Sequence, residues 1–159
     1  MPLRRNANVI LQLLVNSGET VAVAESVTAG GVGHALTIVP GSSQVFLGGI
    51  IAYTNDVKIN FLGVDPALIA EHTVVSEQVA NAMADGAREK FGTTWGIATT
   101  GIAGPGDFEG MSEGTVWVAI RGPINSTIQL QLDSGRDAIR TGAISSAIGT
   151  FARILSSRN

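Results

Sequence analysis

The chain has 159 residues, a length that fits a single domain running from residue 1 to residue 159. Hydrophobic residues make up 45% and charged residues 14%, which excludes a disordered or charge-rich coiled-coil protein. The formal net charge of −3 argues against phosphate neutralisation, so we expect no nucleic-acid partner. The chain has no cysteine, which excludes disulfides, thiolate metal sites and a cysteine nucleophile.

The first segment predicts an amphipathic helix rather than a signal peptide. Apolar residues at helical spacing run over 3–16, and the polar Gln12 interrupts the apolar stretch. The segment 26–55 lacks charged residues, but glycines and Pro40 break it into runs too short for a membrane span. We therefore expect a cytoplasmic protein with no membrane partner.

Predicted strands and helices then alternate along the chain. Apolar runs predict strands over 20–25, 45–54 and 95–100. Helical spacing and capping residues predict a helix over 28–39, a short helix or turn over 55–62, a short helix that begins at Pro66, and a longer one capped by Ser76. Two successive strands, 115–120 and 127–132, precede a last amphipathic helix through 139–151. This order predicts an α/β fold, a three-layer α/β/α sandwich with a mixed β-sheet.

A hydroxyl residue follows the first predicted strand and opens a glycine-rich segment. Ser26 comes directly after the strand, and Gly30 and Gly31 lie at the start of the predicted helix. Ligands of open α/β sheets bind outside the carboxyl ends of the strands, where helix N-termini stabilise negative charge. Ser26 is therefore a candidate nucleophile, with Thr28 and the two glycines as candidate binding residues. The alternative is that Ser26 or Thr28 only caps the helix.

Tyr53 and Lys58 follow the second predicted strand. Lys58 lies between Val57 and Ile59, and apolar surroundings lower the pKa of an ammonium group because desolvation disfavours its charge. A neutral lysine accepts a proton from a serine hydroxyl, so Lys58 is a candidate base for Ser26 in a serine–lysine mechanism. The alternative is a surface lysine with a solvated tip.

A second glycine-rich loop follows the predicted strand over 95–100. Thr100, Gly101 and Gly104 lie where the backbone can approach a ligand closely. The spacing of Gly104, Gly106 and Gly110 departs from the dinucleotide-binding fingerprint, and no P-loop motif is present. The alternative is an ordinary flexible connection.

Two further pairs of polar residues are candidates for binding an anion. Ser42 and Ser43 follow a Pro-Gly turn, and Arg136 and Arg140 lie one helical turn apart at the start of the last helix. An ordinary turn and a solvated helix face are the alternatives for the two pairs. The isolated histidines have no partner at ligand spacing, so we expect no metal site.

Taken together, these segments resemble the CinA C-terminal domain family, whose stand-alone members are nicotinamide-nucleotide amidases. The match covers nearly the whole chain in the family's order. The matching segments are Ala24–Gly31, Pro40–Phe46, Tyr53–Lys58, Leu62–Val64, His72–Glu77, Thr100–Pro105, Gly114–Trp117 and Arg136–Arg140.

The resemblance implies hydrolysis of the carboxamide of nicotinamide mononucleotide to nicotinate mononucleotide and ammonia, without a metal or organic cofactor. It implies Ser26 as nucleophile, Lys58 as its base and Tyr53 as a supporting residue. Amides near Thr28 or in the Gly101 loop would hold the oxyanion. The candidate substrate-binding residues are Thr28, Gly30, Gly31, Ser42, Ser43, Thr100, Gly101, Gly104, Arg136 and Arg140.

The chain departs from the family pattern at several positions. Val27 replaces the family cysteine, Ala29 replaces its first glycine, and Gly135 replaces an acidic residue before the first arginine. The loop over 106–113 lacks the family's Lys-Pro element. These departures leave one alternative, a catalytically silent pyridine-nucleotide-binding module. The family's name of competence/damage-inducible protein leaves another, an interaction protein linked to competence or DNA damage. The low charge content also leads us to expect a homo-oligomer.

Overall fold

The computed structural model describes residues 2–133 and 135–158. The strands are β1 (Val21–Glu25), β2 (Phe46–Ile51), β3 (Trp95–Gly101), β4 (Thr115–Arg121) and β5 (Ser126–Gln131). The helices are α1 (Pro2–Ser17), α2 (Gly31–Leu36), α3 (Asn55–Leu62), α4 (Pro66–His72), α5 (Glu77–Phe91) and α6 (Arg136–Ser156), with a 3₁₀ turn η1 (Ser42–Gln44).

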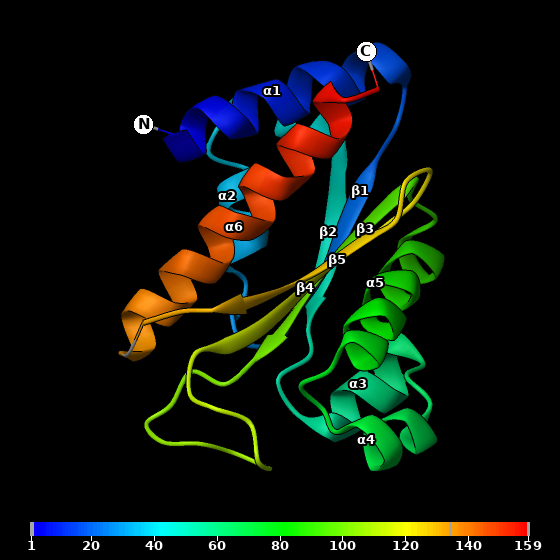
Figure 1. Cartoon of the computed structure of the whole chain (residues 1–159). Helices are drawn as coiled ribbons and strands as arrows, with labels where there is room; N and C mark the ends of the chain where they lie inside the picture. The colour runs from blue at the N-terminus through cyan, green and yellow to red at the C-terminus, as the bar shows by residue number, and fades with distance from the viewer. Residues whose placement is uncertain (1, 134, 159) are drawn as a thin grey trace.

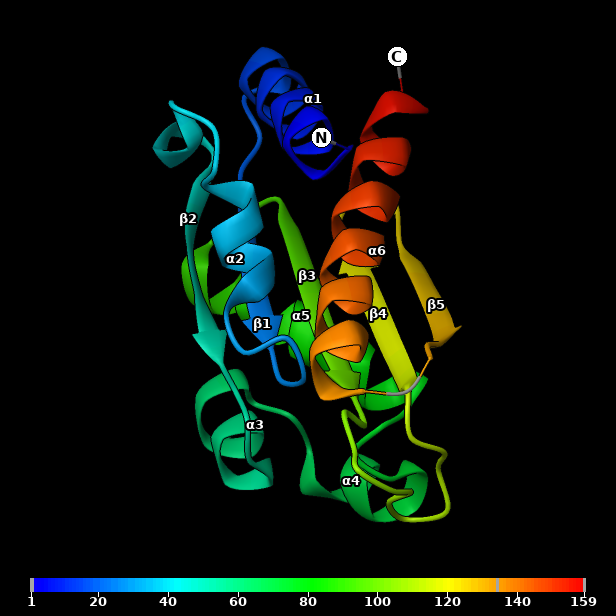
Figure 2. The same cartoon turned by 90° about the vertical axis from the view of Figure 1, so that its left-hand side faces the viewer.

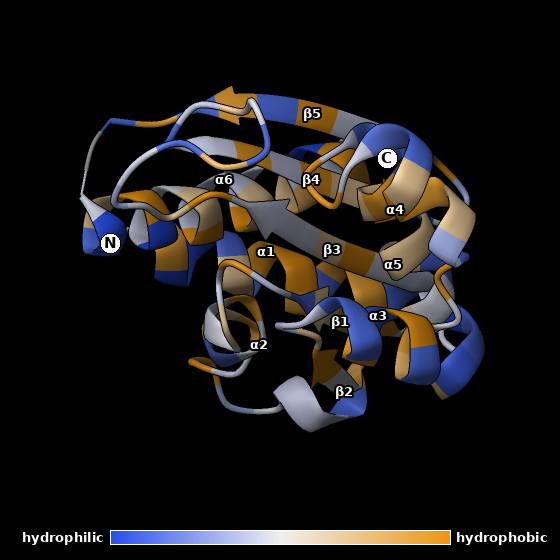
Figure 3. Ribbon diagram, turned by 90° about the horizontal axis from the view of Figure 1, so that it is seen from below, coloured by the Kyte–Doolittle hydropathy of each residue, from blue (hydrophilic) through white to orange (hydrophobic). Residues whose placement is uncertain are grey.

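The strands form one mixed five-stranded sheet in the order β2-β1-β3-β4-β5. β1 pairs in parallel with β2 and β3, and β4 pairs antiparallel with β3 and β5. Helices α1, α2 and α6 cover one face of the sheet, and α3, α4 and α5 lie on the other (Figures 1 and 2). Viewed from below, the strands run in sheet order between the two helix layers (Figure 3). The predicted α/β/α sandwich with a mixed sheet is confirmed.

The alternation of side chains along β1 divides the core into two layers. Val21 and Val23 belong to the layer under α1, α2 and α6, where the rings of Trp95 and Phe151 meet edge-on with their centroids 5.4 Å apart. Ala22 and Ala24 point to the opposite face and belong to the layer under α5, which is rich in alanine. The small side chains let α5 approach the sheet closely.

The structure shortens two of the predicted elements. The helix predicted over 28–39 begins only at Gly31, because Ala29 and Gly30 adopt left-handed backbone angles, with φ of 50° and 99°. The strand predicted over 45–54 is reduced to β2, and its register shifts against β1 between Val21 and Ala22. The last helix, predicted over 139–151, is longer in the structure and spans Arg136–Ser156. The remaining predicted elements agree with the structure to within about two residues at their ends.

Helices in the described part of the chain are too short or too polar to cross a membrane. The prediction of a single domain over 1–159 stays a prediction.

Candidate active site

Ser26 lies where β1 ends, between the ends of its two neighbouring strands. Its backbone amide donates to the Thr99 carbonyl at 3.0 Å, and the Glu25 carbonyl accepts from the Ala52 amide at 2.7 Å. Because β1, β2 and β3 run in parallel, their carboxyl ends meet at this edge of the sheet. The backbone that carries the Ser26 hydroxyl is therefore held from both sides.

Lys58 reaches Ser26 from α3. The helix is capped by the Thr54 hydroxyl, and the Lys58 side chain points into the protein with only 1% of its surface exposed. Its Nζ donates to the Ser26 Oγ at 3.1 Å. Burial lowers the pKa of Lys58 from 10.5 to about 8, because the charged ammonium loses its hydration. The surface-lysine alternative is wrong.

A buried carboxylate fixes the turn that follows Ser26. Glu25 accepts hydrogen bonds from the amides of Val32 and Gly33 at 2.8 and 2.9 Å and from the Thr28 hydroxyl. Thr28 also shares a 2.7 Å hydrogen bond with Thr99. Glu25 therefore satisfies the first amides of α2, and the alternative in which Ser26 or Thr28 caps this helix is wrong.

A cavity of about 400 Å³ opens above the Ser26–Lys58 pair. Seven of the predicted site residues line it, namely Ser26, Tyr53, Lys58, Thr100, Gly101, Gly104 and Arg136. They come from the residue after β1, the β2–α3 connection, α3, the end of β3, the following loop and α6. Segments far apart in the sequence therefore meet around one serine hydroxyl.

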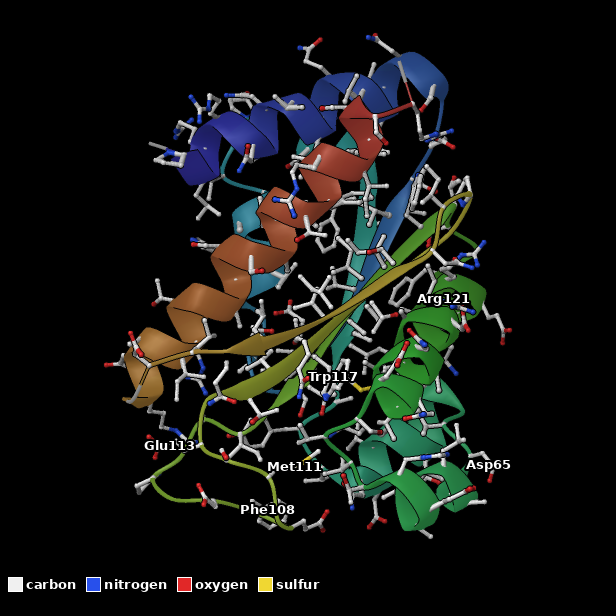
Figure 4. The ribbon with its side chains drawn as sticks, in the orientation of Figure 1. Asp65, Phe108, Met111, Glu113, Trp117 and Arg121 are labelled. Atoms are coloured by element: carbon white, nitrogen blue, oxygen red, sulfur yellow. The ribbon has the colours of Figure 1, made fainter. Side chains whose placement is uncertain are left out.

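Arg136 joins the walls of the cavity at its mouth. Its guanidinium donates to the Tyr53 hydroxyl at 2.7 Å and to the Gly104 carbonyl. The aromatic rings of Tyr53 and Phe108 are 49% and 53% exposed there. Phe108 lies on the loop over 102–114, which Glu113 stabilises by accepting from the Gly106 amide at 2.8 Å (Figure 4). The mouth thus combines a cation with two apolar rings.

Ser42 and Ser43 lie at the opposite end of the sheet from Ser26, which corrects their prediction as site residues. They form η1 just before β2 begins, whereas Ser26 follows the end of the parallel strand β1. The residues that precede one parallel strand and those that follow its neighbour occupy opposite ends of a sheet. The ordinary-turn alternative describes this segment.

Four other predicted binding residues lie beside the cavity rather than on its wall. The Thr28 hydroxyl is bound to Glu25 on the α2 face of the sheet, and Gly31 packs against Ile144 of α6. Gly30, between them, lies beneath the Ile51 side chain. Arg140 donates from Nε to the Val27 carbonyl at 3.0 Å and so supports the turn behind Ser26.

Sequence reasoning missed other residues of the cavity wall. Asn55, Val74, Val75 and Asp107 line it together with Phe108. Asn55 lies inside the segment Tyr53–Lys58, and Asp107 lies in the loop over 106–113. Their polar side chains could therefore have been predicted to line the site. Val74 and Val75 lie inside the matching segment His72–Glu77, but their apolar side chains gave no chemical reason to place them at the site.

The other large hollow of the described structure lacks a comparable pair of side chains. A second hollow of about 680 Å³ runs along α1 beside Arg4, Val9 and Leu13, but it brings together no nucleophile and base. Among residues 2–133 and 135–158, no three His, Cys, Asp or Glu side chains gather in a way that would hold a metal ion.

Comparison with known proteins assigns the chain to a family. The family model of the CinA C-terminal domain matches residues 4–155. The chain belongs to the CinA C-terminal domain family. A CinA-like protein of Synechocystis is 51% identical over 156 residues, and one of Prochlorococcus marinus is 44% identical over 153 residues. These alignments cover 95% and 94% of this chain but only 38% and 36% of the relatives, so this CinA-family chain spans little more than a third of their length.

Solved structures of the family share the fold. The competence/damage inducible protein CihA of Agrobacterium tumefaciens is 31% identical, with a TM-score of 0.90. The match covers 98% of this chain and 96% of that one. A competence-damaged protein (CinA) superfamily protein of Klebsiella pneumoniae is 25% identical, with a TM-score of 0.92 and 98% coverage of both chains. The sheet and helix layers of this CinA-family chain are thus those of known CinA proteins.

Proposed function

We propose that the protein is a serine–lysine amidase that hydrolyses the carboxamide of nicotinamide mononucleotide to nicotinate mononucleotide and ammonia. The observation that carries the proposal is the 3.1 Å contact between Lys58 Nζ and Ser26 Oγ at the floor of a cavity. The lowered pKa of the buried Lys58 supports it, since a neutral amine is required to accept the serine proton. The choice of substrate comes from the family resemblance.

In the first half of the reaction, the Ser26 Oγ attacks the carboxamide carbon while its proton passes to Lys58 Nζ. The carbon–nitrogen bond then breaks, and the Lys58 ammonium returns the proton to the leaving nitrogen, which departs as ammonia. The nucleotide remains attached to Ser26 as an ester. Lys58 serves first as general base and then as general acid.

In the second half, water attacks the ester carbon and gives its proton to Lys58. The bond to the Ser26 Oγ breaks, and Lys58 returns the proton to this oxygen. The products are the nucleotide acid and the regenerated serine. The net reaction consumes one water for each ammonia released.

The oxyanion formed in each half requires hydrogen-bond donors. The amides of Ser26, Ala29, Gly31 and Ile102 already donate to backbone carbonyls. Val27 follows the nucleophile and lines the cavity, so we assign its amide to the oxyanion. Such a donor contributes roughly 3–4 kcal/mol to transition-state stabilisation in other amidases.

Arg136 is the residue we assign to the phosphate of the substrate. Its guanidinium lies at the mouth of the cavity, and its hydrogen-bond partners among the described residues are uncharged, the Tyr53 hydroxyl and the Gly104 carbonyl. A phosphate offers oxygens that a guanidinium binds in a bidentate, charge-assisted manner. The nucleotide would then enter with its carboxamide toward Ser26 and its phosphate at the mouth.

The experiment that tests the proposal is ammonia release from nicotinamide mononucleotide by the wild type and by Ser26→Ala and Lys58→Met. We expect turnover by the wild type and a loss of at least about a thousandfold in each variant, because the dyad acts as a unit. Ser43→Ala is the matched control, since this serine lies at the far end of the sheet.

Two outcomes would contradict the proposal, the first its mechanism and the second its activity. Turnover that survives in both variants would exclude the serine–lysine dyad. A folded wild type that binds the nucleotide, shown by a raised melting temperature, but releases no ammonia would instead support the silent binding module.

A further inference from the structure

Thr100, at the end of β3, has a hydroxyl whose single proton is already in use. The side chain lines the cavity although only 1% of its surface is exposed. Its Oγ1 donates to the Val74 carbonyl at 3.0 Å. A hydroxyl has one proton and two lone pairs, so this hydrogen bond leaves only acceptor capacity toward the cavity.

The Val74 carbonyl is presented by a strained connection between α4 and α5. Thr73 adopts φ 69° and ψ 161°, a backbone region that is essentially restricted to glycine. Its amide donates to the Ile69 carbonyl at 3.0 Å, and its carbonyl accepts from the Ser76 hydroxyl at 2.8 Å. Such a conformation persists only where the surrounding structure fixes it. The Val74 carbonyl, which accepts the hydrogen bond from Thr100, is therefore held in one place.

Thr100 lies beside the nucleophile on the neighbouring strand. Glu25 pairs with Thr99 in the sheet, and each residue is followed by one of the two hydroxyl residues, Ser26 and Thr100. Neighbouring strands are about 4.8 Å apart. The Thr99 side chain is hydrogen-bonded to Thr28 on the α2 face of the sheet. Because side chains alternate along a strand, the Thr100 side chain points to the opposite face, where the Val74 carbonyl accepts its hydrogen bond.

We propose that Thr100 determines specificity for the carboxamide over the corresponding acid. Its lone pair accepts an N–H of the amide that Ser26 attacks, whereas the carboxylate of the product has no proton to offer and is repelled. The site would thus bind primary carboxamides and release carboxylic acids. This inference rests on the proposed amidase function and adds to it the group that recognises the amide nitrogen.

The test is the binding of two nucleotides to Ser26→Ala, which cannot turn over the amide. Nicotinamide mononucleotide and nicotinate mononucleotide are titrated calorimetrically at pH 9, where the pKa of about 8 leaves Lys58 mostly uncharged. We expect the amide to bind about tenfold more tightly than the acid. Thr100→Val in this background should reduce the ratio to near one, and Thr100→Ser should restore it.

Thr115→Val is the matched control in the same background. Thr115 is a buried strand threonine that donates to the Gln131 side chain, outside the cavity wall. The control should keep the preference for the amide. A ratio that survives in folded Thr100→Val would overturn the inference and leave the amidase itself standing, provided that the wild type releases ammonia. Failure of both the wild type and Ser26→Ala to bind either nucleotide would overturn both.

A substrate analogue tests the same point without changing Thr100. In the mononucleotide of 3-acetylpyridine, a methyl group replaces the amide NH₂ and the carbonyl remains. We expect it to bind Ser26→Ala about tenfold more weakly than nicotinamide mononucleotide, because the N–H donors are gone. Equal affinities would show that no acceptor reads the amide nitrogen and would overturn the inference even if Thr100→Val failed to fold.

Discussion

The Lys58 side chain is almost completely buried, and this burial explains the pKa of its amine. It is among the largest fully buried side chains of the described residues, and its Nζ donates a hydrogen bond to the Ser26 hydroxyl. Burial is the cause of its lowered pKa. A charge that loses hydration without gaining a carboxylate partner is destabilised, which is the condition that makes a lysine a base near neutral pH.

The rate of ammonia release should therefore depend on pH through Lys58. With a pKa of about 8, roughly a tenth of the lysine is neutral at pH 7, so the rate should rise about tenfold per pH unit below 8 and level off above it. A pH profile of kcat/KM checks this. A profile that stays flat from pH 6 to 9 in wild-type enzyme would show that Lys58 is not the base.

At the scale of elements, α5 and α3 hold the floor of the site through close contacts made by glycine. A Cβ added to Gly86 of α5 would lie 2.1 Å from the Leu62 carbonyl at the end of α3. One added to Gly96 of β3 would lie 2.2 Å from the Ala84 carbonyl of α5. These glycines let α3, α5 and β3 approach one another, and α3 carries Lys58.

Two alanine substitutions in helices should therefore have opposite effects. Gly86→Ala should destabilise the protein by about 2 kcal/mol or more, because the added methyl group meets backbone that cannot move freely. Gly149→Ala in α6 is the matched control, since its Cβ would find only ordinary contacts beyond 3.7 Å. The control should stabilise by up to about 1 kcal/mol through helix propensity.

Chemical denaturation of both variants measures the difference. If Gly86→Ala were as stable as the wild type, the close packing of α5 on α3 would not be required by the fold. The proposed amidase activity should fall along with the stability, because a displaced α3 would move Lys58 away from Ser26.

At the scale of the whole molecule, one buried lysine makes stability depend on pH. Below pH 8 Lys58 is protonated in both the folded and the unfolded chain, so the cost of burying its charge is fully present. Between pH 8 and 10.5 the unfolded chain binds this proton and the folded chain does not. Stability should therefore rise with pH across this window, by up to about 3 kcal/mol.

Lys58→Met tests this contribution. The variant keeps an unbranched side chain but removes the charge, so its free energy of unfolding should lack the gain that the wild type shows between pH 8 and 10.5. Urea denaturation of both proteins at several pH values checks the difference between the two curves, which cancels the other titrating groups. Parallel curves would mean that Lys58 titrates alike in the folded and unfolded chains.

The sequence by itself determined the fold class and singled out the two residues that we propose as the reacting groups. Periodicity, caps and glycine positions predict most elements and the mixed sheet, because these signals are local. Ser26, Lys58 and the loop after β3 follow from strand ends and from motif spacing. The seven predicted residues that line one cavity belong to such segments.

Only the tertiary structure decided which of the polar segments meet. The direction of the parallel strands places Ser42 and Ser43 at the wrong end of the sheet, and Glu25 turns Thr28 away from the cavity. The direction of the Thr100 proton depends on Val74, a residue with no polar side chain. Long-range contacts of this kind involve backbone atoms that every residue has, so they leave no pattern along the chain.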